Sequence, residues 1–265
     1  MSEDQRIEAP SAAEIERRFQ SPAVLVMRPL LHGGIRLLRA VCRFKWTAEG
    51  VDRLRRVEQP VILAANHCSH VDTGAILWTL PRAVRRRTCV AAALDVFGPI
   101  KDVRTLRVVR RECLQVIVAA GFHAFAFDRH GPPLRSLRTA VGLVRRDWNL
   151  LLYPEGTRSR TGRMGEFKPG IGVMATTTGR PVIPVHVSGG NTILPCGCNI
   201  PRSGRAVVRY GAPLYFNEGE TVQEFTRRLQ QQVRALAPEG DAASRPQESP
   251  QPARARIVSL SRRDY

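Results

Sequence analysis

The sequence of 265 residues contains no uninterrupted apolar run close to the length of about 20 residues that a membrane-spanning helix needs. The first twenty residues are polar and partly acidic, which does not fit a secretory signal peptide. We therefore expect a cytoplasmic protein. If it meets a membrane, we expect it to lie peripherally on the cytoplasmic face.

Acidic residues are few. The chain has 23 acidic residues against 41 basic ones, of which 38 are arginine, and its formal net charge is +18. Such a charge predicts a negatively charged partner, and nucleic acid, an anionic membrane surface and phosphorylated substrates would all satisfy it. Zinc-finger spacing and aromatic-interleaved basic RNA motifs are both missing, which argues against nucleic acid.

Several catalytic and metal-binding patterns are missing as well. The sequence has no Gly-x-Ser-x-Gly elbow of a nucleophilic hydrolase. Its six cysteines are scattered, and Cys196-Gly-Cys198 has no second pair with which to hold zinc. His67 and His70 lack a third metal ligand at useful spacing. We therefore expect free thiols in a reducing compartment and no bound metal.

Apolar runs alternate with helical patterns along the chain. We predict a helical turn or two near 12–19, helices near 105–120, 134–144 and 221–236, and strands at 61–66, 88–94, 122–127, 149–153, 181–187 and 206–210. Strands that alternate with helices imply a single α/β domain whose mainly parallel sheet is flanked by helices. We assign this domain to residues 47–237, after a polar segment at 1–21. A disordered basic tail is expected at 238–265, where apolar residues thin out.

Residues 22–46 have a different character from the segment before them. One helical face gathers apolar side chains and another gathers arginines: Leu31, Ile35, Leu38 and Cys42 against Arg36, Arg39 and Arg43. Lys45 and Trp46 close the segment. This pattern predicts an amphipathic, membrane-contacting helical segment, and the alternative is a surface helix that packs on the core.

Residues 61–72 hold the first candidate site. The apolar run before Asn66 predicts a buried strand, and Ser69 followed by Asp72 predicts a helix start with a capping box. His67 then lies at the carboxyl end of a strand, close enough to Asp72 for a hydrogen bond. A histidine oriented by a carboxylate can act as a general base, whereas the simpler alternative is a histidine that caps the turn.

A second candidate site follows the strand at 149–153. Pro154 stops the strand and Gly156 permits close backbone approach, while Thr157, Arg158, Ser159 and Arg160 offer donors. Such a turn suits a phosphate group. Glu155 would repel phosphate unless it binds a hydroxyl or orders the arginines. Arg129, at the end of another strand, is expected at the same edge of the sheet.

These stretches resemble the glycerolipid acyltransferases related to 1-acylglycerol-3-phosphate acyltransferase. Four blocks follow that family's order over about residues 45–215: Asn66 to Asp72, Phe127 to Arg129, Tyr153 to Arg160, and Pro181 to Val185. Phe167 to Gly170 also resembles a family turn. Two departures stand out, because Tyr153 replaces the usual phenylalanine and the second block lacks its usual glycine.

The resemblance implies a role for each block. His67 would be the general base and Asp72 would orient it. Arg129, Glu155, Gly156, Thr157 and Arg158 would bind the acceptor. Ser69 and Pro184 would be structural or shape the acyl site. The resemblance implies no cofactor beyond the thioester co-substrate, acyl-CoA or acyl carrier protein.

The implied activity is transfer of a fatty acyl group to the free hydroxyl of a lysophosphatidate-like acceptor in phospholipid synthesis. The expected partners are the thioester donor, a lysophospholipid and an anionic membrane surface, without nucleic acid. Two alternatives remain open at this point: an acyltransferase for a different lipid acceptor, and a non-catalytic lipid-binding protein on the same fold.

Overall fold

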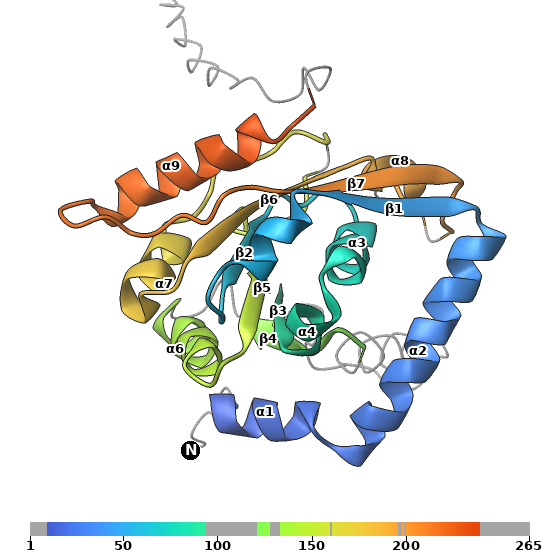
Figure 1. Ribbon diagram of the computed structural model, residues 1–265, viewed down its shortest axis with the longest axis horizontal. Helices are drawn as coiled ribbons and strands as arrows, with labels where there is room; N and C mark the ends of the chain where they lie inside the picture. Colours follow the sequence, from blue (N-terminus) through green and yellow to red (C-terminus); the bar gives the residue numbers. More distant parts are fainter. Residues whose placement is uncertain are drawn as a thin grey trace, which may run out of the picture.

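A computed structural model describes residues 10–93, 121–127, 133–159, 161–195, 198 and 200–238. In this part of the chain, seven strands form one sheet with the order β1-β7-β6-β2-β5-β3-β4 (Figure 1). The strands are β1 Phe44–Glu49, β2 Ile62–Ala65, β3 Thr88–Ala93, β4 Ala124–Phe127, β5 Asn149–Leu152, β6 Val182–Ser188 and β7 Gly204–Tyr210. All neighbouring strands run parallel except β6 and β7. The predicted α/β fold with a mainly parallel sheet is therefore confirmed.

The centre of the sheet is buried on both faces: every residue of β2 and β5 and all but the last of β6 are buried, and most of them are apolar. Alternate residues enter opposite cores. Ile62 and Ala64 pack with α6 Pro133–Val144, α7 Gly170–Thr178 and α9 Val222–Ala235, whereas Leu63 and Ala65 pack with α3 Val71–Thr79 and α4 Arg82–Arg86. Two further short helices are η1 Val51–Arg55 and α8 Gly190–Ile193.

The N-terminal helix α1, Ala12–Phe19, belongs to the core, although the segment around it was expected only to be polar. Ser11 and Glu14 form a capping box that starts the helix. Ile15 and Phe19 are then buried against α6, beside Trp148. Two apolar side chains on one face of an otherwise charged helix are enough to bind it to the domain.

The amphipathic segment is shorter as a helix than its sequence predicts. α2 spans Pro22–Val41, and Arg43 then adopts a left-handed conformation (φ 54°) that ends the helical path. Phe44 to Trp46 form the first half of β1, which pairs with β7. The prediction that Lys45 and Trp46 close a helix is wrong, and the sheet begins before residue 47.

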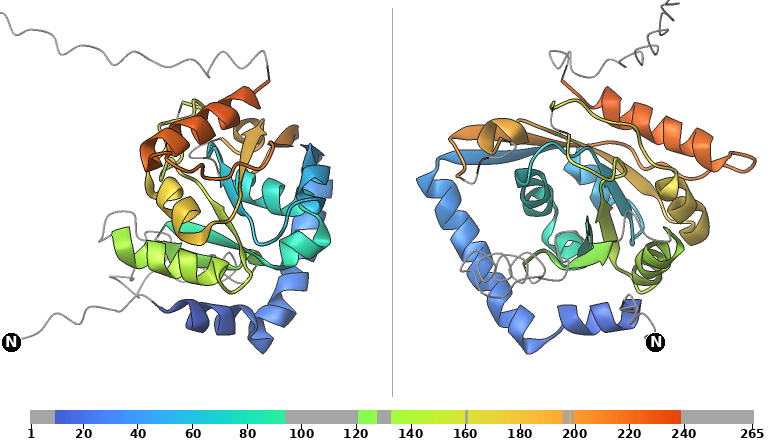
Figure 2. Two further views of the ribbon diagram at one scale, coloured as in Figure 1. Left: turned by 60° about the vertical axis from the view of Figure 1, so that its left-hand side comes forward. Right: turned by 180° about the vertical axis from the view of Figure 1, so that it is seen from behind.

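The orientation of α2 also differs from the prediction. Leu31 lies against Gly121 and Cys42 packs near Phe44, so part of the predicted membrane face contacts the domain instead. Arg39, expected on the polar face, stacks over Trp46 and Trp78, with its guanidinium carbon 4.6 and 4.9 Å from the ring centroids. Helix α1 runs under the domain and α2 rises along its side to β1 (Figure 2).

Two predicted segments cannot be compared with the structure. The helix expected near 105–120 and the tail from residue 239 onward lie outside the described residues. Within the described ranges, no helix combines the length and apolar character needed to cross a bilayer.

The burial of α1 generates the first prediction. We expect Phe19→Ala to lower the free energy of unfolding by about 3 kcal/mol, because the truncation leaves a cavity beside Trp148. Urea denaturation followed by circular dichroism measures this loss. The exposed Arg17 on the same helix provides the control, since Arg17→Ala should change stability by less than about 0.5 kcal/mol. Equal effects of the two variants would contradict the assignment of α1 to the core.

Candidate active site

The turn between β2 and α3 carries the candidate catalytic residues. Asn66, directly after β2, is 2% exposed, and its side-chain amide pairs with the backbone of Val187 on β6. Nδ2 donates to the Val187 oxygen at 3.0 Å, and Oδ1 accepts from the Val187 nitrogen at 2.7 Å. The amide thus continues the pairing of β2 and β6 by one position while the main chain turns away toward His67.

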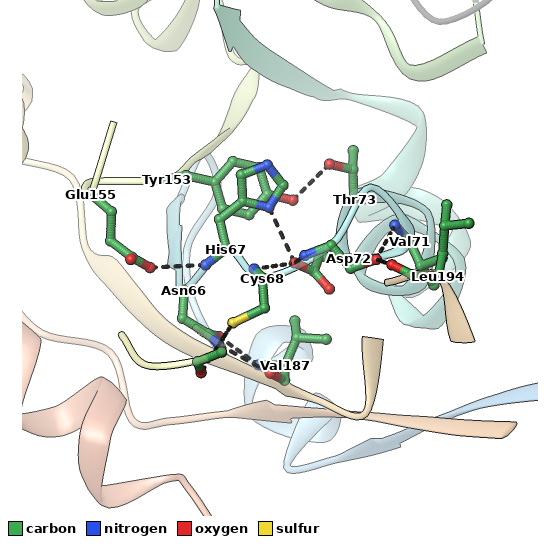
Figure 3. Close-up of polar contacts among 12 residues, drawn as sticks. Asn66, His67, Cys68, Val71, Asp72, Thr73, Tyr153, Glu155, Val187 and Leu194 are labelled. Carbon is green, nitrogen blue, oxygen red and sulfur yellow. Dashed lines mark hydrogen bonds and ion pairs between the residues drawn. The ribbon is translucent and has the colours of Figure 1, made fainter. Parts of the chain in front are cut away.

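Asp72 collects three N–H donors on one carboxylate oxygen. Its Oδ2 accepts from the backbone nitrogens of Cys68 and Ser69, both at 2.7 Å, and lies 3.1 Å from His67 Nδ1 (Figure 3). Asp72 is 1% exposed. An ionised carboxylate only accepts hydrogen bonds, so it is His67 that donates, through Nδ1; in the neutral imidazole, Nε2 is then the nitrogen without a proton. The contact predicted between His67 and Asp72 is present.

The predicted capping box is only half formed. Asp72 reaches back to the Ser69 nitrogen, but the Ser69 hydroxyl accepts from Val71 at 3.3 Å and donates to the Leu194 oxygen at 2.7 Å. The structure assigns the cap position of α3 to His70, without a side-chain cap hydrogen bond. Ser69 therefore ties the start of α3 to the segment after α8, which its local sequence could not reveal.

His67 has a second neighbour, Tyr153. The two rings are stacked, with centroids 3.9 Å apart and an interplanar angle of 16°. Tyr153 follows β5 directly, and its hydroxyl lies 2.6 Å from Thr73 Oγ1. The His67 side chain is 16% exposed, and Nε2 has no hydrogen-bond partner among the described residues. Within the described ranges, Nε2 is therefore the imidazole nitrogen that remains available to a substrate.

Glu155 holds two loops together. Its Oε1 accepts from the His67 backbone nitrogen at 2.9 Å, and its Oε2 accepts from Gly165 at 2.8 Å. The side chain is 6% exposed, and burial raises the pKa of its carboxyl group. These bonds give Glu155 a positioning role that sequence reasoning missed, because both partners are backbone groups. Its predicted contact with an acceptor stays a prediction.

The predicted phosphate-binding turn lies beside His67 and Asp72, the catalytic dyad predicted above. Gly156 is left-handed (φ 72°), with the Lys168 side chain against it. The Ser159 nitrogen donates to the His67 oxygen at 2.8 Å, which brings the turn to the end of β2. Thr157 is exposed. Partial desolvation and the nearby charge of Arg158 lower the pKa of His70, so Arg158 also lies near the catalytic turn.

Two other predicted residues stand apart from this cluster. Pro184 lies inside β6 opposite Ala64, and its oxygen accepts from Gly211 at 2.8 Å, which is a structural position within the sheet. Arg129 lies outside the described residues. In the parts of the chain described, no three His, Cys, Asp or Glu side chains converge as metal ligands.

The comparisons with known proteins agree with this geometry. The model of the family named Acyltransferase matches residues 45–188, which is more than half of the chain. The chain belongs to the Acyltransferase family. The matched region begins inside β1 and ends with β6, so it contains His67, Asp72, Glu155 and the turn at Gly156.

Curated relatives have related names. The chain is 38% identical over 161 residues to a chloroplastic 1-acyl-sn-glycerol-3-phosphate acyltransferase of Arabidopsis thaliana, covering 58% of this chain and 39% of that protein. It is 25% identical over 166 residues to the enzyme of that name from Cocos nucifera, covering 60% and 47%. The matches therefore span less than half the length of these relatives.

A solved structure supports the fold. The crystal structure of the 1-acyl-sn-glycerophosphate acyltransferase PlsC from Thermotoga maritima superposes with a TM-score of 0.57 and 20% sequence identity. The match covers 80% of this chain and 78% of that one.

The buried carboxylate of Glu155 generates the second prediction. Glu155→Gln replaces one acceptor oxygen by a donor, so one backbone N–H, at His67 or Gly165, loses its partner. We expect a loss of about 1–3 kcal/mol in the free energy of unfolding, measured by urea denaturation. The exposed Glu166 is the matched control, and Glu166→Gln should have little effect. A loss no larger than that of the control would contradict the tethering role.

The difference in stability between the wild type and Glu155→Gln should depend on pH. Because burial raises the folded-state pKa of Glu155, the folded protein takes up this proton at a higher pH than the unfolded chain. The stability of the wild type relative to Glu155→Gln should therefore rise as pH falls through the folded-state pKa, and level off below the ordinary value.

Proposed function

We propose that the protein transfers a fatty acyl group from a thioester to the free hydroxyl of a lysophosphatidate-like acceptor. The proposal rests chiefly on one observation: at the carboxyl edge of a mainly parallel sheet, His67 is held at Nδ1 by Asp72, and its Nε2 has no partner among the described residues. This is the arrangement of a general base. Membership of the Acyltransferase family and the names of the relatives support the same chemistry.

The mechanism follows from the orientation of the imidazole. Nε2 of His67 takes the proton of the acceptor hydroxyl while the hydroxyl oxygen attacks the thioester carbonyl carbon. Asp72 stabilises the imidazolium that forms. When the carbon–sulfur bond breaks, the imidazolium returns the proton to the leaving thiolate. The products are the acylated acceptor and a free thiol, and no acyl-enzyme intermediate is needed.

The acceptor phosphate is assigned to the turn beside the dyad. Arg158 and the backbone around Gly156 lie near His67, and Thr157 adds an exposed hydroxyl. We extend this set to Arg129 by its sequence position. The donor would be acyl-CoA or an acyl carrier protein. Both are negatively charged, so a chain of net charge +18 attracts them.

The membrane would be reached through the outer face of α2, which we define as Val26, Leu30, Leu37 and Val41. These side chains are 65%, 70%, 66% and 71% exposed, and their spacing places them along one side of the helix. Positive charge gathers around Arg85, because Arg36 of α2 and Arg82 and Arg86 of α4 lie near it. Burial, followed by the charges of these three arginines, lowers the pKa of the Arg85 guanidinium. An apolar face beside such positive charge suits a peripheral position on an anionic membrane, which we place on the cytoplasmic side.

The activity is tested by thiol release. With acyl-CoA and lysophosphatidate, we expect release that depends on the acceptor, and His67→Ala should lower turnover by about 10²- to 10⁴-fold because the general base is lost. His70→Ala serves as control, since that exposed histidine makes no hydrogen bond to Asp72.

Other results of this assay would redirect the assignment. Release with acyl carrier protein or another lysolipid alone would change the donor or the acceptor and keep the chemistry. Acceptor-dependent turnover that survives in His67→Ala would remove His67 from the mechanism. Binding of lysolipid without any thiol release would favour the non-catalytic alternative.

The outer face of α2 generates a separate prediction. The double variant Leu30→Asp and Leu37→Asp should bind vesicles of phosphatidylglycerol and phosphatidylcholine at least about tenfold more weakly, because two apolar side chains no longer enter the bilayer interface. Co-sedimentation measures the change. Ile200, which is 76% exposed and outside α2, is the control. If Ile200→Asp weakens binding equally, α2 is not the membrane-binding face.

A further inference from the structure

Tyr153 occupies the face of the catalytic imidazole. Its ring is nearly parallel to that of His67, with 3.9 Å between the centroids, whereas Asp72 contacts the edge of the same imidazole at Nδ1 (Figure 3). The two neighbours thus restrain different movements. A single hydrogen bond at Nδ1 lets the imidazole tilt about the bond axis, and a ring against its face prevents that tilt.

The tyrosine is itself anchored. Its hydroxyl is buried, which raises the hydroxyl pKa well above the usual value, and it lies 2.6 Å from Oγ1 of Thr73. Thr73 directly follows Asp72 in the first turn of α3. Asp72, at the edge of the imidazole, and Thr73, which anchors Tyr153, therefore belong to the same helical turn. Tyr153 itself comes from the segment directly after β5.

We propose that Tyr153 is a positioning residue for His67, with its ring setting the plane of the imidazole and its hydroxyl fixing that ring to Thr73. The inference rests on the function proposed above and extends it to a residue outside the dyad. A base must hold its reactive nitrogen in line with the acceptor hydroxyl, and a displacement of about 1 Å can cost on the order of 10²-fold in rate. The electron-rich face of tyrosine also favours the imidazolium formed during the reaction.

The chain supplies a matched control for the hydroxyl. Tyr210 places its hydroxyl 2.8 Å from Thr79 Oγ1, also on α3 but at the opposite end of the helix from Asp72, and donates to the Ile76 oxygen of the same helix at 3.1 Å. Its ring contributes to the core under α3. Tyr210→Phe and Tyr153→Phe therefore remove the same type of tyrosine–threonine bond from the same helix, and only one of those bonds adjoins the imidazole.

Steady-state kinetics test the positioning role. We expect Tyr153→Leu to lower kcat by about 10- to 100-fold with KM nearly unchanged, because the acceptor still binds while the base is misaligned. Tyr153→Phe should keep most of the wild-type kcat and lose only a few fold. Thr73→Val should show the same loss, and the double variant of Tyr153→Phe and Thr73→Val should lose no more than either single variant. Tyr210→Phe should lower the melting temperature at least as much as Tyr153→Phe and leave kcat unchanged.

The opposite results would overturn the proposal. A Tyr153→Leu protein with wild-type kcat would show that the stack does not position the base. A loss of kcat in Tyr210→Phe equal to that in Tyr153→Phe would show that the hydroxyl acts only through the stability of α3.

A readout without turnover separates this inference from the proposed function. In histidine-labelled protein, the Tyr153 ring should shift the His67 proton resonances upfield, and the shift should persist in Tyr153→Phe and disappear in Tyr153→Leu. An unchanged spectrum in Tyr153→Leu would refute the stack. If the wild-type protein transfers no acyl group, the proposed function fails, and the spectra still decide whether Tyr153 holds the imidazole.

Discussion

The site depends on one buried carboxylate oxygen. Oδ2 of Asp72 accepts from two backbone nitrogens and from the imidazole of His67, so the main chain between β2 and α3 wraps around a single acceptor. Each donor would be costly to bury without a partner, and together they leave the turn few other conformations. The position of the imidazole is therefore a consequence of how the chain folds around Asp72.

The surrounding strands reinforce this turn because parallel strands bring their carboxyl ends to one edge. β6 contributes the backbone of Val187, which receives Asn66, and the segment after β5 contributes Glu155 and Tyr153. Gly190, just after β6, comes so close to Asp72 that a side chain there would collide with its second oxygen. The turn that carries His67 is thus contacted from the ends of both strands that flank β2, with β5 reaching His67 itself and β6 reaching Asn66.

The parts of this arrangement that could be predicted are those with local signals. Buried parallel strands are mostly apolar runs, so β2, β5 and β6 were evident, and His67 and Asp72 lie in one short motif. β1 was missed because charged residues interrupt this edge strand, which resembles the end of the preceding helix. The role of Glu155 was missed because its partners are backbone groups of two loops. The stack on Tyr153 depends on the pairing of β2 with β5, which local patterns do not encode.

The central claim is that Asp72 holds His67 in the tautomer protonated at Nδ1, with Nε2 available as a base. Nitrogen-15 NMR of histidine-labelled protein, at a pH where His67 is neutral, measures this directly. We predict a protonated Nδ1 and an unprotonated Nε2 for His67, identified by its absence in His67→Ala. The same spectrum should show mixed tautomers in Asp72→Asn. A His67 protonated at Nε2 in the wild-type protein would contradict the account.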